Sequence, residues 1–170
     1  MSAEVLLDTS FLITLVDANR SNHSIARRYY QYLLRTTVPM RLSAIVAAEF
    51  AIKQPITDLP LGNFRPLDFN LTHGQQAANL WNALGQRDAD DARAVVRDDV
   101  KLLAQASREQ IDCVLTEDAS TLQKYCERLR SAGYIKTRAI VLGYGFDPSA
   151  LRSDGQKDWI GDSIGDAQDA

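Results

Sequence analysis

Cysteine and histidine, the usual ligands of zinc sites, are scarce in this sequence. Its 170 residues include two cysteines, Cys113 and Cys126, and two histidines, His23 and His73. The cysteines lack CxxC spacing, and neither histidine has a second His or Cys at ligand spacing. We therefore expect free thiols in a reducing compartment, and neither a zinc site nor a histidine-based metal site.

Long hydrophobic runs are also missing. No apolar stretch approaches the ~20 residues that a membrane-spanning helix needs. The N-terminus lacks the basic region and the small-residue cleavage site of a signal peptide. Hydrophobic residues make up 45% of the chain and charged residues 24%, as is usual for globular proteins. We expect one globular, cytoplasmic domain without membrane contact.

Acidic residues are absent from one long window. Residues 18–48 contain no Asp or Glu but five arginines, namely Arg20, Arg27, Arg28, Arg35 and Arg41. Residues 147–170 hold six of the 22 acids and two of the 19 bases, so the rest of the chain has a net charge near +1. A basic face on a near-neutral body suits a polyanion partner such as a nucleic acid, in which case Arg27, Arg28 and Arg35 would hold its backbone. The alternative is a solvated helix face.

Apolar runs and periodic patterns alternate along the chain. Short apolar runs predict strands at residues 5–7, 40–42, 65–69, 112–116 and 137–142. Amphipathic patterns and capping residues predict helices at residues 10–16, 23–35, 44–53, 72–84, 88–109 and 119–130. This alternation indicates an α/β fold with helices on both faces of a parallel sheet. We place the domain at residues 1–146, followed by an acidic, flexible tail at residues 147–170.

Two predicted strands end in hydroxyl and acidic residues. The segment VLLDTS runs from the first strand into Asp8, and VLTED runs from a later strand into Glu117 and Asp118. Ligands of open α/β sheets bind outside the carboxyl ends of the strands, so these acids are candidate functional residues. The alternative is that each acid only caps the helix that follows it.

Two further acids lie on predicted helices. Glu49 shares a helix face with Ile45 and Ile52, and a carboxylate on an apolar face is costly unless it is paired or metal-bound. Helical geometry allows only one of Asp98 and Asp99 to face a given site. We predict that Asp99 points inward, on one face with Val95, Leu102, Leu103 and Ala106. Asp98 is predicted on the other side, with Lys101 and Gln105.

Four acids in one place would require a counter-charge. Clustered carboxylates repel one another, and an oxygen-only donor set suits Mg²⁺ or Mn²⁺. Such ions activate water for phosphodiester hydrolysis. We expect the four carboxylates to converge in one cleft at the carboxyl edge of the sheet. Without a metal ion, their mutual repulsion should raise their pKa values.

Together these segments resemble the PIN-domain ribonucleases, most closely the VapC-type toxins. The resemblance rests on DTS at residues 8–10, Ser43 followed by Glu49, Asp99 leading into LLAQA, and TED at residues 116–118. It implies a three-layer α/β/α sandwich with a mainly parallel sheet and Mg²⁺- or Mn²⁺-dependent endoribonuclease activity. Carried over by motif, the catalytic and metal-binding acids are Asp8, Glu49, Asp99 and Asp118. Ser10 and Thr116 become accessory site residues, and the loop at residues 54–65 and the acidic tail depart from the pattern.

Other functions fit the sequence less well. A haloacid-dehalogenase-type phosphatase needs an aspartate where this chain has Ser10. A dinucleotide-binding fold needs a third glycine after Gly143 and Gly145. A catalytically inactive PIN-like module that binds protein or RNA is the main alternative to a nuclease. A toxin role implies an antitoxin protein as partner. The family resemblance and the apolar excess at residues 29–33 also predict a homodimer.

Overall fold

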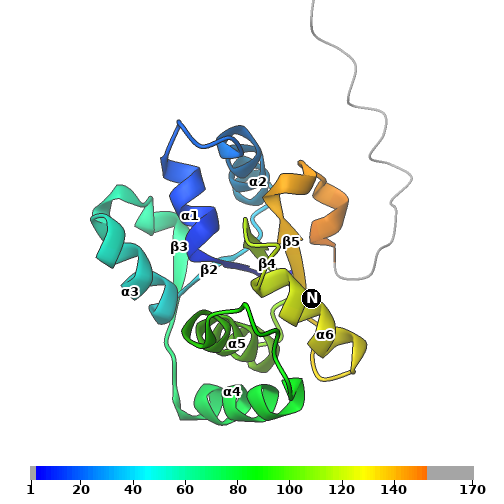
Figure 1. Ribbon diagram of the computed structural model, residues 1–170. Helices are drawn as coiled ribbons and strands as arrows, with labels where there is room; N and C mark the ends of the chain where they lie inside the picture. The colour runs from blue at the N-terminus through cyan, green and yellow to red at the C-terminus, as the bar shows by residue number, and fades with distance from the viewer. Residues whose placement is uncertain (1–2, 153–170) are drawn as a thin grey trace, which may run out of the picture.

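A computed structural model gives the structure of the protein and describes residues 3–152 (Figure 1). Its single sheet has the strand order β3-β2-β1-β4-β5, and every neighbouring pair is parallel. The strands are β1 Val5–Leu7, β2 Met40–Ser43, β3 Phe64–Leu67, β4 Cys113–Thr116 and β5 Arg138–Val141. The central strands β1 and β4 are buried at every position, as expected of strands covered on both faces.

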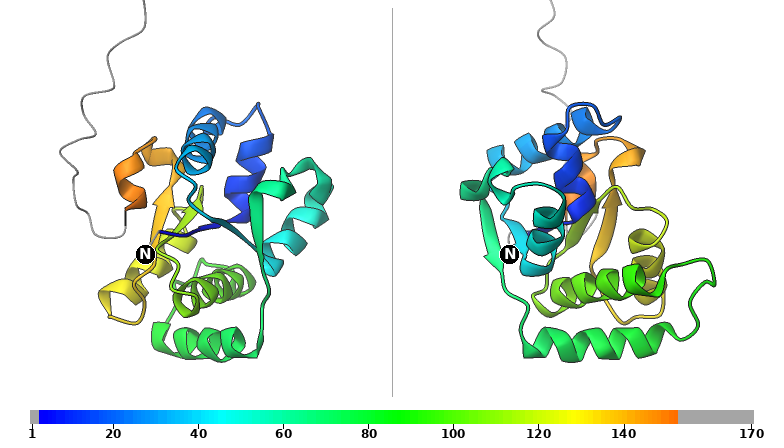
Figure 2. Two further views of the ribbon diagram at one scale, coloured as in Figure 1. Left: turned by 180° about the vertical axis from the view of Figure 1, so that it is seen from behind. Right: turned by 60° about the vertical axis from the view of Figure 1, so that its left-hand side comes forward.

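Helices cover both faces of this sheet. They are α1 Thr9–Val16, α2 His23–Arg35, α3 Ala44–Lys53, α4 Leu71–Leu84, α5 Arg93–Arg108 and α6 Leu122–Ser131. Helix α1 contacts α2 and α3 on one face, whereas α4, α5 and α6 contact one another on the other face (Figures 1 and 2). The predicted α/β/α sandwich is therefore confirmed. None of the helices between residues 3 and 152 has the length and apolar character needed to cross a membrane.

The winding of the chain reverses between β1 and β4. From β1 the chain moves outward to β2 and β3, then returns across the sheet to β4 and moves outward again to β5. The carboxyl ends of β1 and β4 thus lie side by side at a topological switch point, where α/β proteins bind their ligands. The N–H of Asp8 donates to the Leu115 carbonyl at 3.0 Å, which fixes the first acid against the end of β4.

Helix α5 begins at Arg93, five residues later than the pattern predicted. The acids before it are held by the neighbouring helix instead. Asp88 pairs with Lys124 at 2.9 Å and with Arg128 at 2.7 Å, and Asp91 also pairs with Lys124. These ion pairs tie the segment between α4 and α5 to α6, and periodicity along one helix does not reveal them.

The loop at residues 54–65 is more ordered than expected. It contains two short 3₁₀ helices, Ile56–Asp58 and Leu61–Asn63, before β3 starts at Phe64. The two cysteines are buried free thiols, as predicted. Burial raises the pKa of both thiols to about 12, so they remain protonated and unreactive at neutral pH.

The segment after β5 packs on α2. Pro148–Leu151 form a 3₁₀ helix in which Leu151 is buried, although we placed these residues in the tail. The Tyr29 hydroxyl accepts a hydrogen bond from the Asp147 N–H at 3.0 Å, and its ring contacts Phe146 at 4.9 Å. Packed structure therefore continues to residue 152, and the rest of the predicted tail, residues 153–170, lies outside the described range.

The aromatic side chains of α2 are used within the chain. Tyr29 and Leu33 are buried, Tyr32 packs edge-on against Phe146, and Tyr30 packs against Phe64. The apolar excess from which we predicted a homodimer is thus absorbed by the core and by the segment after β5.

Candidate active site

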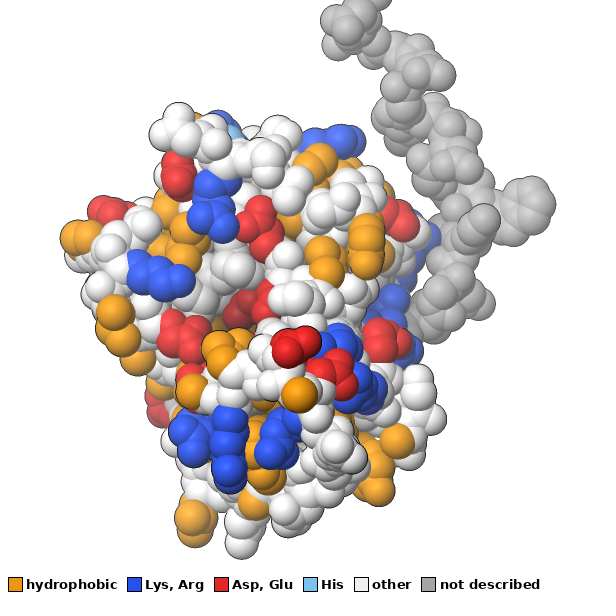
Figure 3. Space-filling model, in the orientation of Figure 1, with side chains coloured by type: hydrophobic (Ala, Val, Ile, Leu, Met, Phe, Trp, Pro, Cys, Tyr) orange, Lys and Arg blue, Asp and Glu red, His pale blue; other side chains and the backbone are white. Residues whose placement is uncertain are grey.

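One pocket at the carboxyl edge of the sheet brings the four predicted acids together. It has a volume of about 460 Å³, and its lining includes Asp8, Glu49, Asp99 and Asp118. Figure 3 shows acidic side chains gathering in a hollow near the centre of this face. The rest of the lining comes from α1, α3, α5 and the α1–α2 turn, with Thr9, Ser10, Ile13, Arg20, Ile52, Lys53, Ala94, Val95 and Asp98.

Asp8 is the most deeply buried of the four acids. It lies at the N-cap position of α1, but its side chain makes no capping hydrogen bond. Instead Oδ2 accepts from the hydroxyls of Thr116 at 2.7 Å and Ser10 at 2.8 Å. Burial raises the pKa of Asp8, while these two donors act in the opposite direction. The capping alternative is wrong for Asp8, because its carboxylate is aimed across the sheet edge at β4.

The two predicted accessory residues connect the ends of β1 and β4. Ser10 accepts the N–H of Glu117 at 2.9 Å, and Thr116 accepts the N–H of Asp118 at 2.9 Å. Both hydroxyls also donate to Asp8. Each therefore accepts from the backbone on one side and donates to the acid on the other, which fixes the carboxylate at the switch point.

Glu49 enters the pocket from α3. Its carboxylate accepts a hydrogen bond from the Thr9 hydroxyl. Burial, and then the nearby charges of Asp8 and Asp98, raise its pKa. We predicted that Glu49 and Ile52 share one face of α3. Both line the pocket, and Ile52 is 85% exposed. The buried side of α3 is formed by Val46 and Phe50 instead.

Asp99 enters from α5 and has an unsatisfied atom. Its Oδ2 is buried without a hydrogen-bond partner within residues 3–152. Burial, followed by the charges of Asp8, Asp118 and Glu49, raises the pKa of Asp99 to about 8. A buried carboxylate oxygen without a donor is rare and calls for a ligand or a proton.

The predicted phase of α5 is partly wrong. Asp99 does face the site and Asp98 does pair with Lys101, at 3.0 Å, although Asp98 also lines the pocket. Val95, predicted in the core, is 46% exposed and lines the pocket with Asp99. Gln105, predicted on the outer face, is buried and accepts from the Ser43 hydroxyl. Residues 102–106 at the end of α5 are all buried, so this part of the helix has no exposed outer face.

Asp118 differs from the other three acids. Its Oδ1 accepts from the N–H and hydroxyl of Ser120, both at 2.8 Å, and from the N–H of Thr121 at 2.9 Å. Burial acts to raise its pKa, but the hydrogen bonds from Thr121, Ser120 and Leu122 outweigh it and the pKa is lowered. The expectation of four raised pKa values is thus wrong for Asp118, and for the others burial contributes more than repulsion.

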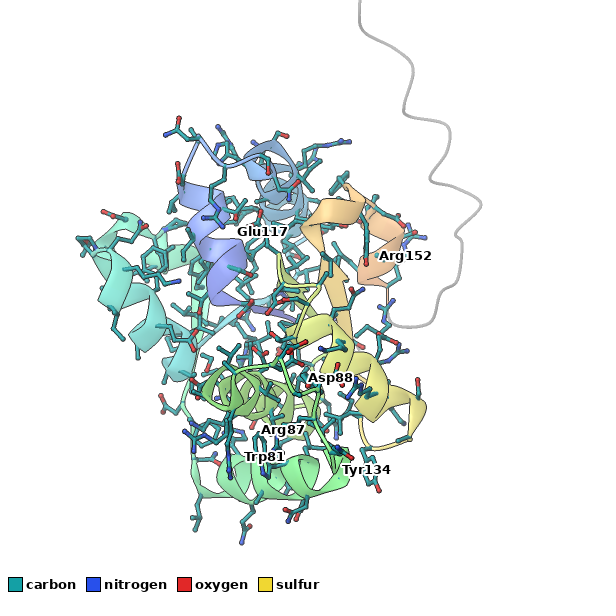
Figure 4. All side chains as sticks on the ribbon, in the orientation of Figure 1. Trp81, Arg87, Asp88, Glu117, Tyr134 and Arg152 are labelled. Carbon is teal, nitrogen blue, oxygen red and sulfur yellow. The ribbon has the colours of Figure 1, made fainter. Side chains whose placement is uncertain are left out.

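Glu117 turns away from the acidic cluster toward the α1–α2 turn (Figure 4). It pairs with Arg20 at 2.9 Å and accepts from Asn22 at 3.2 Å. Burial would raise the pKa of Glu117, but these donors lower it. Of the two acids that follow β4, Asp118 is therefore the one that lines the pocket.

The cations beside the acids are Arg20 and Lys53. Lys53 escaped the sequence analysis, although its place four residues after Glu49 puts it on the same helix face. The predicted RNA-binding residues Arg27, Arg28 and Arg35 are exposed on α2 and do not line this pocket. The guanidinium of Arg28 lies 4.5 Å from the centre of the Phe146 ring.

The residues of the pocket match a hard cation in chemistry but not in arrangement. Within residues 3–152, no three His, Cys, Asp or Glu side chains are placed so that they could hold a metal ion. The carboxylates of Asp8, Glu49 and Asp118 accept from neighbouring hydroxyls instead. The donors are all oxygens, as Mg²⁺ and Mn²⁺ prefer, and the orphaned Oδ2 of Asp99 offers a free ligand atom.

Comparison by sequence finds neither a matching protein family nor a matching characterised protein. Comparison by structure finds similar folds. VapBC2 from Rickettsia felis, bound to a promoter DNA fragment, has a TM-score of 0.55 at 14% identity over 79% of this chain and 97% of that one. FitAcB from Neisseria gonorrhoeae has a TM-score of 0.55 at 16% identity, over 82% and 99% of the two chains. VapC20 from Mycobacterium tuberculosis, a toxin that cleaves the sarcin-ricin loop, has 0.51 at 18% identity, over 79% and 99%.

These structures show the fold of this chain. The protein has the PIN-domain fold of VapC-type toxins. Sequence identities of 14–18% establish a shared fold but not a shared activity, so the function has to be argued from the pocket.

Proposed function

We propose that this protein is a metal-dependent endoribonuclease of the toxin–antitoxin type. The observation that carries the proposal is the convergence of Asp8, Glu49, Asp99 and Asp118 on one pocket at the topological switch point. A buried acidic cluster is costly for folding, and an orphaned carboxylate oxygen adds to that cost. Residues retained at such a cost are expected to serve binding or chemistry.

Each acid has a distinct role in this proposal. Asp8 is held rigidly by Thr116 and Ser10, and Asp99 supplies the unpartnered oxygen, so these two are the main ligands of Mg²⁺ or Mn²⁺. Glu49 and Asp118 would complete the coordination directly or through water. When bound, the ion supplies a water of lowered pKa and stabilises the charge of the phosphodiester. The hydroxyls of Thr9 and Thr121 hold Glu49 and Asp118 in orientation.

Two features of the similar proteins extend the proposal. VapC20 is described as cleaving the sarcin-ricin loop, an RNA, which supports RNA as the substrate class here. The VapBC and FitAcB structures support an antitoxin protein as partner of this chain. The homodimer stays a prediction from the family resemblance, and light scattering at tens of micromolar, a concentration suited to moderate affinities, tests it.

The decisive experiment compares Asp99→Asn with Asp98→Asn, two neighbours with the same charge change. RNA cleavage is measured with Mg²⁺, with Mn²⁺ and with EDTA. We expect the wild type to cut only with metal, Asp99→Asn to lose at least about 100-fold, in line with the loss of a catalytic electrostatic group, and Asp98→Asn to stay within a few-fold. Cleavage in EDTA, or equal losses in the two variants, would refute the proposal.

One observation favours a second function. The described acids do not form a ready metal site, and Asp118 is occupied by donors at the start of α6. A catalytically inactive PIN-like module that binds protein or RNA would look the same. Calorimetric titration with Mn²⁺ separates the two. A nuclease should bind Mn²⁺ and lose this binding in Asp99→Asn, whereas the inactive module should not bind Mn²⁺ through Asp99.

A further inference from the structure

Helices α4 and α5 form a second surface feature, a basic groove around Trp81. The groove has a volume of about 250 Å³, and its lining includes Trp81, Arg93, Arg97 and Lys101. Arg87 adds its guanidinium 3.9 Å from the centre of the Trp81 ring, and Arg93 lies 5.6 Å from the same centre. Figure 3 shows Lys and Arg side chains gathered around hydrophobic ones over these two helices.

Charges in this region are sorted by sign. The acids of the α4–α5 connection turn to α6, where Asp88 and Asp91 pair with Lys124 and Asp88 also pairs with Arg128. Figure 4 shows Arg87 beside Trp81, with Asp88 toward α6. Within residues 3–152, Arg87, Arg93 and Arg97 have no carboxylate within ion-pair distance. Three arginines therefore present unneutralised charge on one surface.

Trp81 holds one of these arginines in position. A guanidinium stacked over an indole at 3.9 Å is in a favourable cation–π arrangement. The stacking limits the rotamers of Arg87 and leaves its N–H groups free to bind an anion. Trp81 is thus a positioning residue for a phosphate-binding side chain.

The groove and the acidic pocket share one wall. Asp98 and Asp99 of α5 line the pocket, and Arg97 and Lys101 of the same helix line the groove. A helix with its side chains is about 10–12 Å across, so a chain leaving the pocket over α5 reaches the groove within that distance. Both features lie on the face seen in Figure 3.

From this arrangement we infer that the RNA strand runs from the acidic pocket across α5 and binds its phosphates in the Trp81 groove. The inference rests on the proposed function and names the path of its substrate. An RNA strand is the occupant that fits, because the arginines form a line of positive charge beside a site that needs a phosphodiester. The groove then takes the place of α2 as the main source of RNA affinity, because α5 lines both the groove and the pocket, whereas no residue of α2 lines the pocket.

The test compares two double variants of equal charge in the full chain. Arg93→Ala/Arg97→Ala removes two groove cations, and Arg27→Ala/Arg28→Ala removes two from α2. Both are made in the Asp99→Asn background, which is expected not to cut, and binding of labelled single-stranded RNA is measured by fluorescence anisotropy across a salt series. Trp81→Phe is a third variant, which removes the indole under Arg87 but keeps an aromatic ring.

The slope of the logarithm of the binding constant against the logarithm of the salt concentration measures the number of phosphate contacts. We expect this slope to be smaller in magnitude by about 1.4 in the groove variant, since each lost contact to a single strand contributes about 0.7. At 0.1 M salt this corresponds to roughly 25-fold weaker binding by the same relation. The α2 variant should stay near the parent, and Trp81→Phe should weaken binding several-fold. In the cutting enzyme, the groove variant should raise KM more than it lowers kcat, which a merely structural change would not do.

Two other results would overturn the inference and are distinguishable. If the α2 variant flattens the slope and the groove variant does not, the path runs over α2 and the proposed nuclease function survives. If the parent binds no RNA and the wild type cuts none with metal, the proposed function itself fails, and with it the path.

Discussion

The protonation of Asp99 makes a sharp prediction about stability. Its pKa rises from an ordinary value of 3.8 to about 8 in the folded chain, mainly because the carboxyl is buried. An acid with a raised folded pKa binds more protons when folded than when unfolded between the two values. Stability is therefore fully present below pH 4 and falls as the pH rises from about 4 to about 8.

The substitution Asp99→Asn removes this penalty, because the amide is neutral at every pH. At 1.36 kcal/mol per pKa unit, the penalty in the wild type at pH 7 is of order 4 kcal/mol. The variant should therefore exceed the wild type in free energy of unfolding near neutral pH, and the difference should vanish near pH 4. Urea unfolding in EDTA, repeated across this range, measures the difference directly.

Asp98→Asn is the matched control. It breaks an exposed ion pair with Lys101, so it should change stability by at most about 1 kcal/mol and should show no such pH profile. Addition of Mg²⁺ should stabilise the wild type and not Asp99→Asn, since only a ligand of the folded state shifts the equilibrium. If the effect of Asp99→Asn is destabilising at pH 7 or independent of pH, the carboxyl is ionised in the free protein and our reasoning about this site is wrong.

Three further predictions test other parts of the structure. Thr116→Val removes a donor from Asp8 and should lower the free energy of unfolding by about 1–3 kcal/mol in urea titrations, whereas Thr116→Ser should lose little; equal losses would count against the hydroxyl. Leu151→Ala should cost about 2–5 kcal/mol by the same assay, and no loss would mean that the last 3₁₀ helix is not part of the core. Arg20→Ala should raise the pKa of Glu117 toward its ordinary value in an NMR titration, and an unchanged pKa would show that the ion pair is absent in solution.

The fold was predictable because its signals are local. Short apolar runs between amphipathic segments give parallel strands and covering helices, and all five strands start within one residue of their predicted position. The late start of α5 was not predictable, since it depends on Lys124 and Arg128 from another helix. The inverted placement of Val95 and Gln105 has a similar cause, because the end of α5 is enclosed by neighbours on most sides.

The acids themselves were predictable because strand ends and helix phase are written in the sequence. Where the positive charge gathers was not, since it depends on tertiary structure. The sequence indicated Arg27, Arg28 and Arg35 as RNA-binding residues because no acid lies near them in sequence, and this assignment stays a prediction. In the folded chain, net charge depends on which side chains lie close together in space. The acids Asp88 and Asp91 pair with cations of α6, which leaves the nearby Arg87 and Arg97 without a carboxylate partner among the described residues.

The state of each acid depends on its hydrogen-bond donors, which the pattern of acids does not reveal. Asp118 and Asp99 line the same pocket, yet their pKa values shift in opposite directions. Backbone N–H groups and hydroxyls surround Asp118, whereas Oδ2 of Asp99 has no donor. The carboxyl of Asp118 is therefore ionised at neutral pH by its own hydrogen-bond donors, whereas that of Asp99 needs a nearby cation to ionise. A metal ion entering this pocket would displace a proton from Asp99, so its affinity should rise with pH up to about 8.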